Sequence, residues 1–196
     1  MDSREPMLFT EGFVPGSINI GLSGRFAEWA GSLLPFDKPI VLVTDAGKEK
    51  ETVVRMARVG FAQIQGCLDG GFATWKKAGE PVDMIINIEP DELALDLPYD
   101  DKLLVIDVRR EAEFADGHIQ GAVNLPLNEL TDPGTVARIE EDLNVYVHCA
   151  SGYRSIIACS LIKRQGLHNI RNIVGGWNLI KDLSSIQIEK ENSVLN

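Results

Sequence analysis

The sequence lacks a long apolar run, an excess of positive charge and a regular cysteine pattern, and each absence excludes a class of protein. No apolar stretch approaches the ~20 residues that span a bilayer, and the opening MDSREPMLF lacks the apolar core of a secretory signal. The formal net charge of -10 disfavours binding to nucleic acid, which needs clustered cations. The odd number of cysteines, at irregular separations, suits a reducing compartment. We therefore predict a cytoplasmic protein that binds neither nucleic acid nor a membrane.

The chain contains the same pattern twice. The segment FTEGFVPGSINIGL, which starts at Phe9, matches FADGHIQGAVNLPL, which starts at Phe114, at a constant offset of 105 residues. The same offset relates three further pairs, namely Asp2 to Asp107, Arg4 to Arg109 and Gly71 to Gly176. Because the repeat spans most of each half of the chain, it predicts two related domains.

Strand and helix patterns alternate within each copy. LLVIDVR from Leu103, NVYVHC from Asn144 and NIRNIV from Asn169 are short aliphatic runs typical of buried strands. SIIACSLIKRQG has apolar residues at helical spacing and ends at Gly166, which suits a helix stop. In the first copy PIVLVTD, KEKETVVRMARVG and FAQIQGCL repeat the order strand, helix, strand. The expected fold class is α/β, with a parallel sheet flanked by helices in each domain.

The boundary between the copies is expected near Met84, which gives domains at 1–84 and 85–196. INIEPDELALDL then supplies the first strand and helix of the second domain, because Pro90 and the acids after it suit a helix start. At the offset of 105 the first copy has only Met1 ahead of Asp2. We therefore expect the first domain to be N-terminally truncated and the chain to be the C-terminal part of a longer polypeptide.

The segment VHCASGYRS carries the chemistry that we expect. Cys149 falls at the carboxyl end of a buried strand, where open α/β sheets keep their active sites. The small residues after it let backbone N–H groups point at the sulfur, and these groups, the helix start and Arg154 favour a thiolate. A preformed thiolate needs no catalytic histidine, and the His148 side chain is predicted to point to the opposite face of the strand.

These motifs resemble the rhodanese family. DVRREAEFADGHIQGAVNLP, HCASGYRS and NIVGGW carry the resemblance, which covers nearly the whole chain as two copies. It implies transfer of sulfane sulfur from thiosulfate or a persulfide to a thiol acceptor through a Cys149 persulfide, with no metal and no organic cofactor. The residues that it places around the sulfur are Ala150, Ser151, Gly152, Tyr153 and Arg154. Related protein phosphatases have a loop one residue longer, so this loop length favours sulfur transfer.

The first copy departs from the pattern at the reacting position. Its counterpart of the loop is VTDAGKEKE, which the alignment reads with Asp45 in place of Cys149 and with no arginine. This loop is also expected to be shorter, since 15 residues separate Asp45 from Gly60 and 17 separate Cys149 from Gly166. A carboxylate cannot form a persulfide, so the first domain is predicted to be catalytically inactive.

Several residues allow two interpretations. Asp107 and Arg109 end a buried strand near the site, where they could bind substrate or form an ion pair that ties strand to loop. Packing is preferred to a chemical role for Cys67, Cys159, His118 and Trp177.

The function also has an alternative, in which the chain is a sulfur-carrier or binding module for an upstream domain. Tandem copies of this kind resemble the tail of proteins that begin with a metallo-β-lactamase-fold domain. Turnover with free thiosulfate separates an independent enzyme from such a module.

Overall fold

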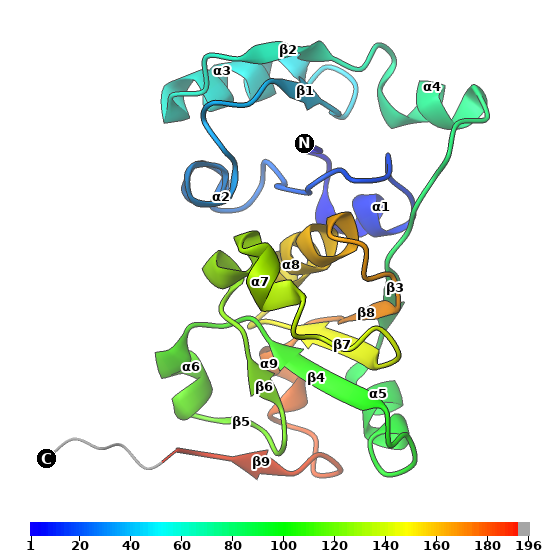
Figure 1. The fold of residues 1–196 in the computed structure, drawn as a ribbon, viewed down its shortest axis with the longest axis vertical. Coiled ribbons are helices and arrows are strands. Elements are labelled where there is room, and N and C mark those ends of the chain that lie inside the picture. The colour runs from blue at the N-terminus through cyan, green and yellow to red at the C-terminus, as the bar shows by residue number, and fades with distance from the viewer. Residues whose placement is uncertain (192–196) are drawn as a thin grey trace, which may run out of the picture. The chain divides into compact units, whose positions relative to one another are not determined.

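The computed structural model describes residues 1–191 and divides into two compact units, Met1–Met84 and Ile85–Asn196 (Figure 1). Both units alternate strands with helices and pair their main strands in parallel. The predicted α/β class with a parallel sheet flanked by helices is therefore confirmed.

The second unit is built on a parallel sheet of five strands. Their order across the sheet is β3 (Ile86–Ile88), β8 (Ile170–Ile173), β7 (Asn144–His148), β4 (Leu103–Asp107) and β6 (Val123–Asn124). The central β7 is buried along almost its whole length, as its aliphatic sequence predicts. A short antiparallel pair joins β5 (His118–Ile119) to β9 (Ile188–Glu189).

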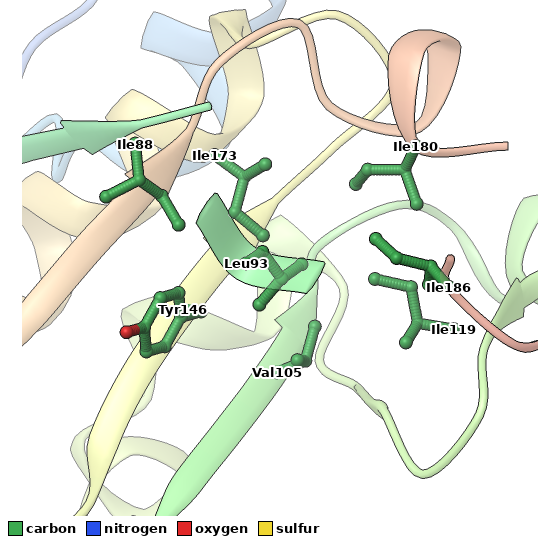
Figure 2. Close-up of a cluster of buried hydrophobic side chains, with 8 residues drawn as sticks. All are labelled: Ile88, Leu93, Val105, Ile119, Tyr146, Ile173, Ile180 and Ile186. Carbon is green, nitrogen blue, oxygen red and sulfur yellow. The ribbon is translucent and has the colours of Figure 1, made fainter. Parts of the chain in front are cut away.

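Helices cover both faces of this sheet. The helical segments are α5 (Pro90–Asp96), α6 (Glu111–Ala115), the 3-10 turn η1 (Leu127–Thr131), α7 (Pro133–Val136), α8 (Tyr153–Arg164) and α9 (Trp177–Ile180). The long α8 packs on β7, β8 and η1. On the other face α5 and α9 close a core of buried side chains, which Figure 2 shows: Ile88, Leu93, Val105, Ile119, Tyr146, Ile173, Ile180 and Ile186.

The first unit has a smaller parallel sheet, with its strands in the same spatial order as their counterparts in the second unit. Strands β1 (Ile40–Leu42) and β2 (Ile64–Cys67) pair in parallel, and Asp2 forms parallel bridges with Val43 and Asn19. In the second unit the corresponding position is the end of β4. Within residues 1–84, the first unit has no strand there, and the bridges of Asp2 take its place. The helices are α1 (Pro6–Thr10), α2 (Phe26–Leu33), α3 (Glu49–Val59) and α4 (Gly71–Lys77).

Strand register corrects the alignment of the two loops. Asp107 pairs with His148 in the second unit, and its counterpart Asp2 bridges to Val43 in the first. Val43 therefore corresponds to His148, so Thr44 and not Asp45 stands where the second unit has Cys149. The offset of 105 residues gives the same correspondence, whereas the shared valine and alanine of VTDA and VHCA align at an offset of 104 and place Asp45 there.

The two loops also have the same length, which corrects the expectation of a shorter first loop. Gly47 in the first unit and Gly152 in the second each follow the reacting position by three residues, and both have positive φ, at 79° and 103°. The one-residue difference lies after the helix instead, because Gly60 directly follows α3 whereas Gln165 stands between α8 and Gly166.

Candidate active site

Cys149 lies directly after β7 and is almost fully buried, with 1% of its surface exposed. The backbone N–H of Gly152 donates to Cys149 Sγ at 3.2 Å. The left-handed conformation of Gly152 then turns the chain from the loop into α8. Strand end, loop and helix start thus present a donor to the sulfur, as the sequence predicts for a thiolate site.

The segment Gly176–Asn178 binds the backbone carbonyls of the active-site loop. Trp177 N–H donates to Cys149 O at 2.7 Å, and Asn178 N–H donates to Ala150 O at 3.0 Å. Gly176 has φ +54°, and a Cβ there would lie 2.3 Å from Cys149 O. Only glycine therefore fits at this close approach between two backbone segments.

A chain of buried side-chain hydrogen bonds runs from the sulfur into the sheet. The Cys149 thiol donates to Ser155 Oγ at 3.7 Å, and Ser155 Oγ donates to Asn172 Oδ1 at 2.7 Å. Asn172 Nδ2 in turn donates to Asn87 Oδ1 on the edge strand β3, at 2.9 Å. The chain fixes the position of Ser155 beside the sulfur.

Arg154 is bound to a carboxylate on α6. Its Nη1 and Nη2 donate to Glu113 Oε2 and Oε1 at 2.7 and 2.8 Å, a bidentate pair. The hydrogen bonds from Arg154 hold the pKa of Glu113 at about 2, below its ordinary 4.5, and the bond raises the pKa of Arg154. The backbone N–H of Arg110 also donates to Glu113 Oε2, at 3.1 Å. The loop arginine and α6 are thereby joined.

Asp107 and Arg109 bind each other and lie buried. Arg109 Nη2 donates to Asp107 Oδ2 at 2.6 Å and to Gly117 O at 2.7 Å, and its guanidinium stacks 4.4 Å from the ring of Trp177. Asn124 Nδ2 adds bonds to the backbone oxygens of both residues.

The first unit repeats this arrangement, residue for residue. Arg4 binds Asp2 at 2.7 Å and Gly12 O at 2.9 Å, and it lies 4.3 Å from the ring of Phe72. Asn19 again bonds to the backbone of both members of the pair. Since the first unit keeps this framework without the cysteine, the geometry favours the ion pair that ties strand to loop, one of the two roles that the sequence left open.

His148 lies against Asp107 and Trp177, not against the sulfur. Its Nε2 is 3.7 Å from Asp107 Oδ2, and its ring centroid is 6.5 Å from that of Trp177. Burial lowers the pKa of His148, so the ring is neutral.

The remaining cysteines differ from Cys149 in their surroundings. Cys159 is fully buried inside α8, and burial raises its thiol pKa. Cys67 is partly buried at the end of β2, and burial together with Glu49 raises its pKa as well. Both shifts disfavour the thiolate.

His118 packs on an aromatic neighbour. Its ring stacks on Phe114 with centroids 3.7 Å apart, and its Nδ1 lies 3.0 Å from Phe114 O. In the first unit Phe13 stacks on Phe9 at the same two positions, with centroids 4.1 Å apart. Because the apolar Phe13 takes the place of His118 in the first unit, we infer that the His118 ring serves packing.

The other loop residues line the site to different extents. Ala150 and Tyr153 are partly exposed, Ser151 is exposed, and Tyr153 is the first residue of α8. Sequence reasoning had missed Glu113, Ser155, Asn172 and Asn87. For Glu113 the signal was available, because the first copy has Leu8 at the corresponding position and Glu49 at that of Arg154.

In the loop of the first unit, a backbone N–H binds a side chain of the same segment. Gly47 N–H, the counterpart of the Gly152 donor, binds Glu49 Oε1 at 3.2 Å. A carboxylate thus stands where the second unit has Arg154, and it occupies the N–H that would face a sulfur anion. Thr44 carries a hydroxyl in place of the thiol.

Within residues 1–191, no helix is long and apolar enough to cross a membrane. The same residues contain no group of three or more His, Cys, Asp or Glu side chains arranged to hold a metal ion.

Comparisons with known proteins match both units. The model of the family described as the rhodanese-like domain matches residues 1–78 and 89–183. A sulfurtransferase of Allochromatium vinosum is 33% identical over 93 residues, which cover 47% of this chain and 85% of that protein. YrkF of Bacillus subtilis, a candidate sulfur carrier, is 35% identical over 77 residues, 39% of this chain and 40% of its own length.

Solved structures share the fold. The rhodanese-like domain of an Anabaena protein matches with a TM-score of 0.50 and 23% sequence identity. The match covers 58% of this chain and 85% of that domain.

Proposed function

The chain belongs to the rhodanese-like domain family, and on that premise we propose that the second unit transfers sulfane sulfur through a persulfide on Cys149. The observation that carries the proposal is the Gly152 N–H, which donates to Cys149 Sγ from the first turn of α8. Such a donor, together with the helix start, stabilises negative charge on sulfur in both the thiolate and the persulfide. The sulfurtransferase of Allochromatium vinosum, which aligns over most of its length, supports the same activity.

The proposed reaction has two steps. The Cys149 thiolate attacks the outer sulfur of the donor, a new S–S bond forms, and the donor's own bond to that sulfur breaks. With thiosulfate the leaving group is sulfite, and with a persulfide R–S–SH it is the thiolate R–S⁻. An acceptor thiolate then attacks the outer sulfur of the Cys149 persulfide, takes that sulfur and releases the Cys149 thiolate.

We assign the surrounding residues as follows. The backbone from Ala150 to Gly152 forms the cradle, Arg154 ties the loop to α6 through its ion pair with Glu113, and Tyr153 lies at the rim. Asp107 and Arg109 hold the end of β4 against the loop through their buried ion pair. We propose no metal and no organic cofactor for this chemistry. All three cysteines are free thiols, which supports a reducing, cytoplasmic setting.

The test compares three cysteine variants. Cys149→Ser is expected to lose sulfur transfer from both thiosulfate and a low-molecular-weight persulfide, because the reacting sulfur is gone. Cys67→Ser and Cys159→Ala should retain transfer, since both thiols lie outside the loop. Equal loss in either of these two, with the fold intact by circular dichroism, would contradict the assignment.

The sulfur-carrier alternative is favoured by the similarity to YrkF. In that alternative Cys149 receives sulfur from an attached or partner enzyme, for which a metallo-β-lactamase-fold hydrolase or dioxygenase remains our proposal. A carrier would accept one sulfur on Cys149 but would not turn over with small donors and acceptors. An enzyme turns over repeatedly with them, and steady-state kinetics distinguishes the two.

A further inference from the structure

We propose that Glu113 sets the class of sulfur donor: by neutralising Arg154 it favours persulfides of thiols over the thiosulfate dianion. The inference rests on the sulfurtransferase function proposed above and adds the preferred donor to it.

The guanidinium of Arg154 is already bound at both of its terminal nitrogens. Nη1 and Nη2 donate to the two oxygens of Glu113, in the planar geometry that an anionic donor would need. A thiosulfate ion could bind this arginine only by displacing the carboxylate or by approaching it against like charge. The loop arginine is therefore not a vacant anion site.

Glu113 is itself held in place. It is the third residue of α6, and its Oε2 accepts the backbone N–H of Arg110 at the start of that helix. Releasing Arg154 by moving Glu113 would also break this capping bond. The carboxylate stays ionised, because Arg154 holds the pKa of Glu113 at about 2. The pair is thus neutral in sum throughout the physiological pH range.

The other charged groups near the loop also cancel. Arg109 is buried, with 3% of its surface exposed, and its charge is matched by Asp107. His148 is neutral because burial lowers its pKa. The two ion pairs beside the loop, Arg109 with Asp107 and Arg154 with Glu113, are thus each neutral in sum and add no excess positive charge to offset a dianion.

The two donors make different electrostatic demands. Thiosulfate brings two negative charges toward a thiolate, and sulfite leaves with both of them. A thiol persulfide brings one charge at most, and its protonated form R–S–SH brings none. Because like charges in a partly buried site repel strongly, a site with no net positive charge discriminates against the dianion.

The first unit shows that the pair is separable from the fold. It retains the counterparts of Asp107, Arg109 and Asn124 with the same hydrogen bonds. It lacks the pair, since Leu8 and Glu49 stand at the positions of Glu113 and Arg154. The first unit therefore lacks the counterparts of Glu113 and Arg154 together, and it also lacks the reacting cysteine.

The experiment compares Glu113→Gln with Glu111→Gln. Both changes remove one negative charge from the first turn of α6, but Glu111 is exposed and only Glu113 binds Arg154. The readout is kcat/KM for thiosulfate and for glutathione persulfide, with a common thiol acceptor. We expect Glu113→Gln to raise kcat/KM for thiosulfate by about tenfold, because removal of one charge restores a net positive field. The value for the persulfide should change far less, and Glu111→Gln should change neither.

The unmodified chain gives a second test that needs no variant. Its kcat/KM should be higher for glutathione persulfide than for thiosulfate, and a preference for thiosulfate would overturn the proposal. So would an unchanged ratio of the two donors in Glu113→Gln, or an equal fall for both. If neither donor adds sulfur to Cys149, the sulfurtransferase function itself fails, and the two failures are thereby distinguished.

Discussion

The buried pair of Asp107 and Arg109 is the residue-scale feature whose role is most directly testable. Removing one partner leaves an uncompensated buried charge, which costs about 3–5 kcal/mol. We predict that Arg109→Ala lowers the free energy of unfolding of the second unit by this amount. Urea unfolding measures the loss when it is followed by the fluorescence of Trp177, which stacks on Arg109, in a background where Trp29 and Trp75 are replaced by phenylalanine.

The matched change in the first unit is Arg4→Ala. It removes the same bonds to Asp2 and Gly12 and should destabilise the first unit without altering sulfur transfer. Unaltered stability in Arg109→Ala together with a raised KM for the donor would instead assign Arg109 to substrate binding.

Glu113 gives a prediction about pH. Its pKa is about 2 in the folded protein and 4.5 ordinarily, so its ion pair adds stability that is present above pH 4.5 and lost as the pH falls toward 2. The difference in unfolding free energy between the unmodified chain and Glu113→Gln should therefore be constant at neutral pH and should shrink below pH 4.5. Acid titration of both proteins by circular dichroism measures it, and a constant difference down to pH 2 would contradict the ion pair.

Single residues were predictable where a local motif specified them. Cys149 and Arg154 follow from the strand, loop and helix pattern in which they stand. The Glu113 partner of Arg154 lies 41 residues away, and the fold alone brings the two together. The assignment of Thr44 was also available from the sequence, because Thr44 lies 105 residues before Cys149, at the offset that relates the rest of the repeat, and the strand register agrees with it.

At the scale of elements, the contact between the Gly175–Gly176 turn and the active-site loop makes a sharp prediction. A side chain at position 176 would collide with Cys149 O at 2.3 Å and would also require a positive φ. We expect Gly176→Ala to displace the loop and to reduce sulfur transfer at least ~100-fold, because misplacing a reacting group by about 1 Å costs that much. Steady-state assays measure the loss.

The control for this change is Gly121→Ala. Gly121 also has positive φ, at 77°, but a Cβ there meets nothing within 4 Å. Gly121→Ala should lose about 1 kcal/mol of stability through backbone strain alone, Gly176→Ala should lose more because of the collision, and only Gly176→Ala should lose activity. Retained activity in Gly176→Ala would show that the turn does not position the loop.

The longer elements could be predicted from the sequence and the short ones could not. β4, β7 and β8 fall within the aliphatic segments expected for them, and α8 begins two residues before the periodic segment that predicts it. The two-residue strands β5, β6 and β9 were missed, because so few residues carry no periodicity and their pairing depends on the rest of the fold.

At the scale of the whole molecule, the two units share a framework and differ at the reacting loop. We predict that Thr44→Cys, made in the Cys149→Ser background, does not restore sulfur transfer. The new thiol would face Gly47 N–H, which already binds Glu49, and would have a carboxylate where the second unit has Arg154. The assay is turnover with both donors.

Adding Glu49→Arg to that background tests the reason that we give for the predicted inactivity of the first unit. If the carboxylate is what blocks the site, this change should raise the reactivity of the thiol introduced by Thr44→Cys toward an alkylating reagent. Full turnover by Thr44→Cys without the second change would show that the first unit needs no arginine and that our assignment of the loop is wrong.

The central claim is that Cys149 alone carries sulfur in this chain. The most direct measurement is mass spectrometry of peptides after incubation with glutathione persulfide and, separately, with thiosulfate, without reducing agent. We predict a gain of one sulfur atom on the peptide that contains Cys149, removable by a thiol acceptor, and none on the peptides that contain Cys67 or Cys159. Sulfur on either of those peptides with Cys149 unmodified would contradict the account.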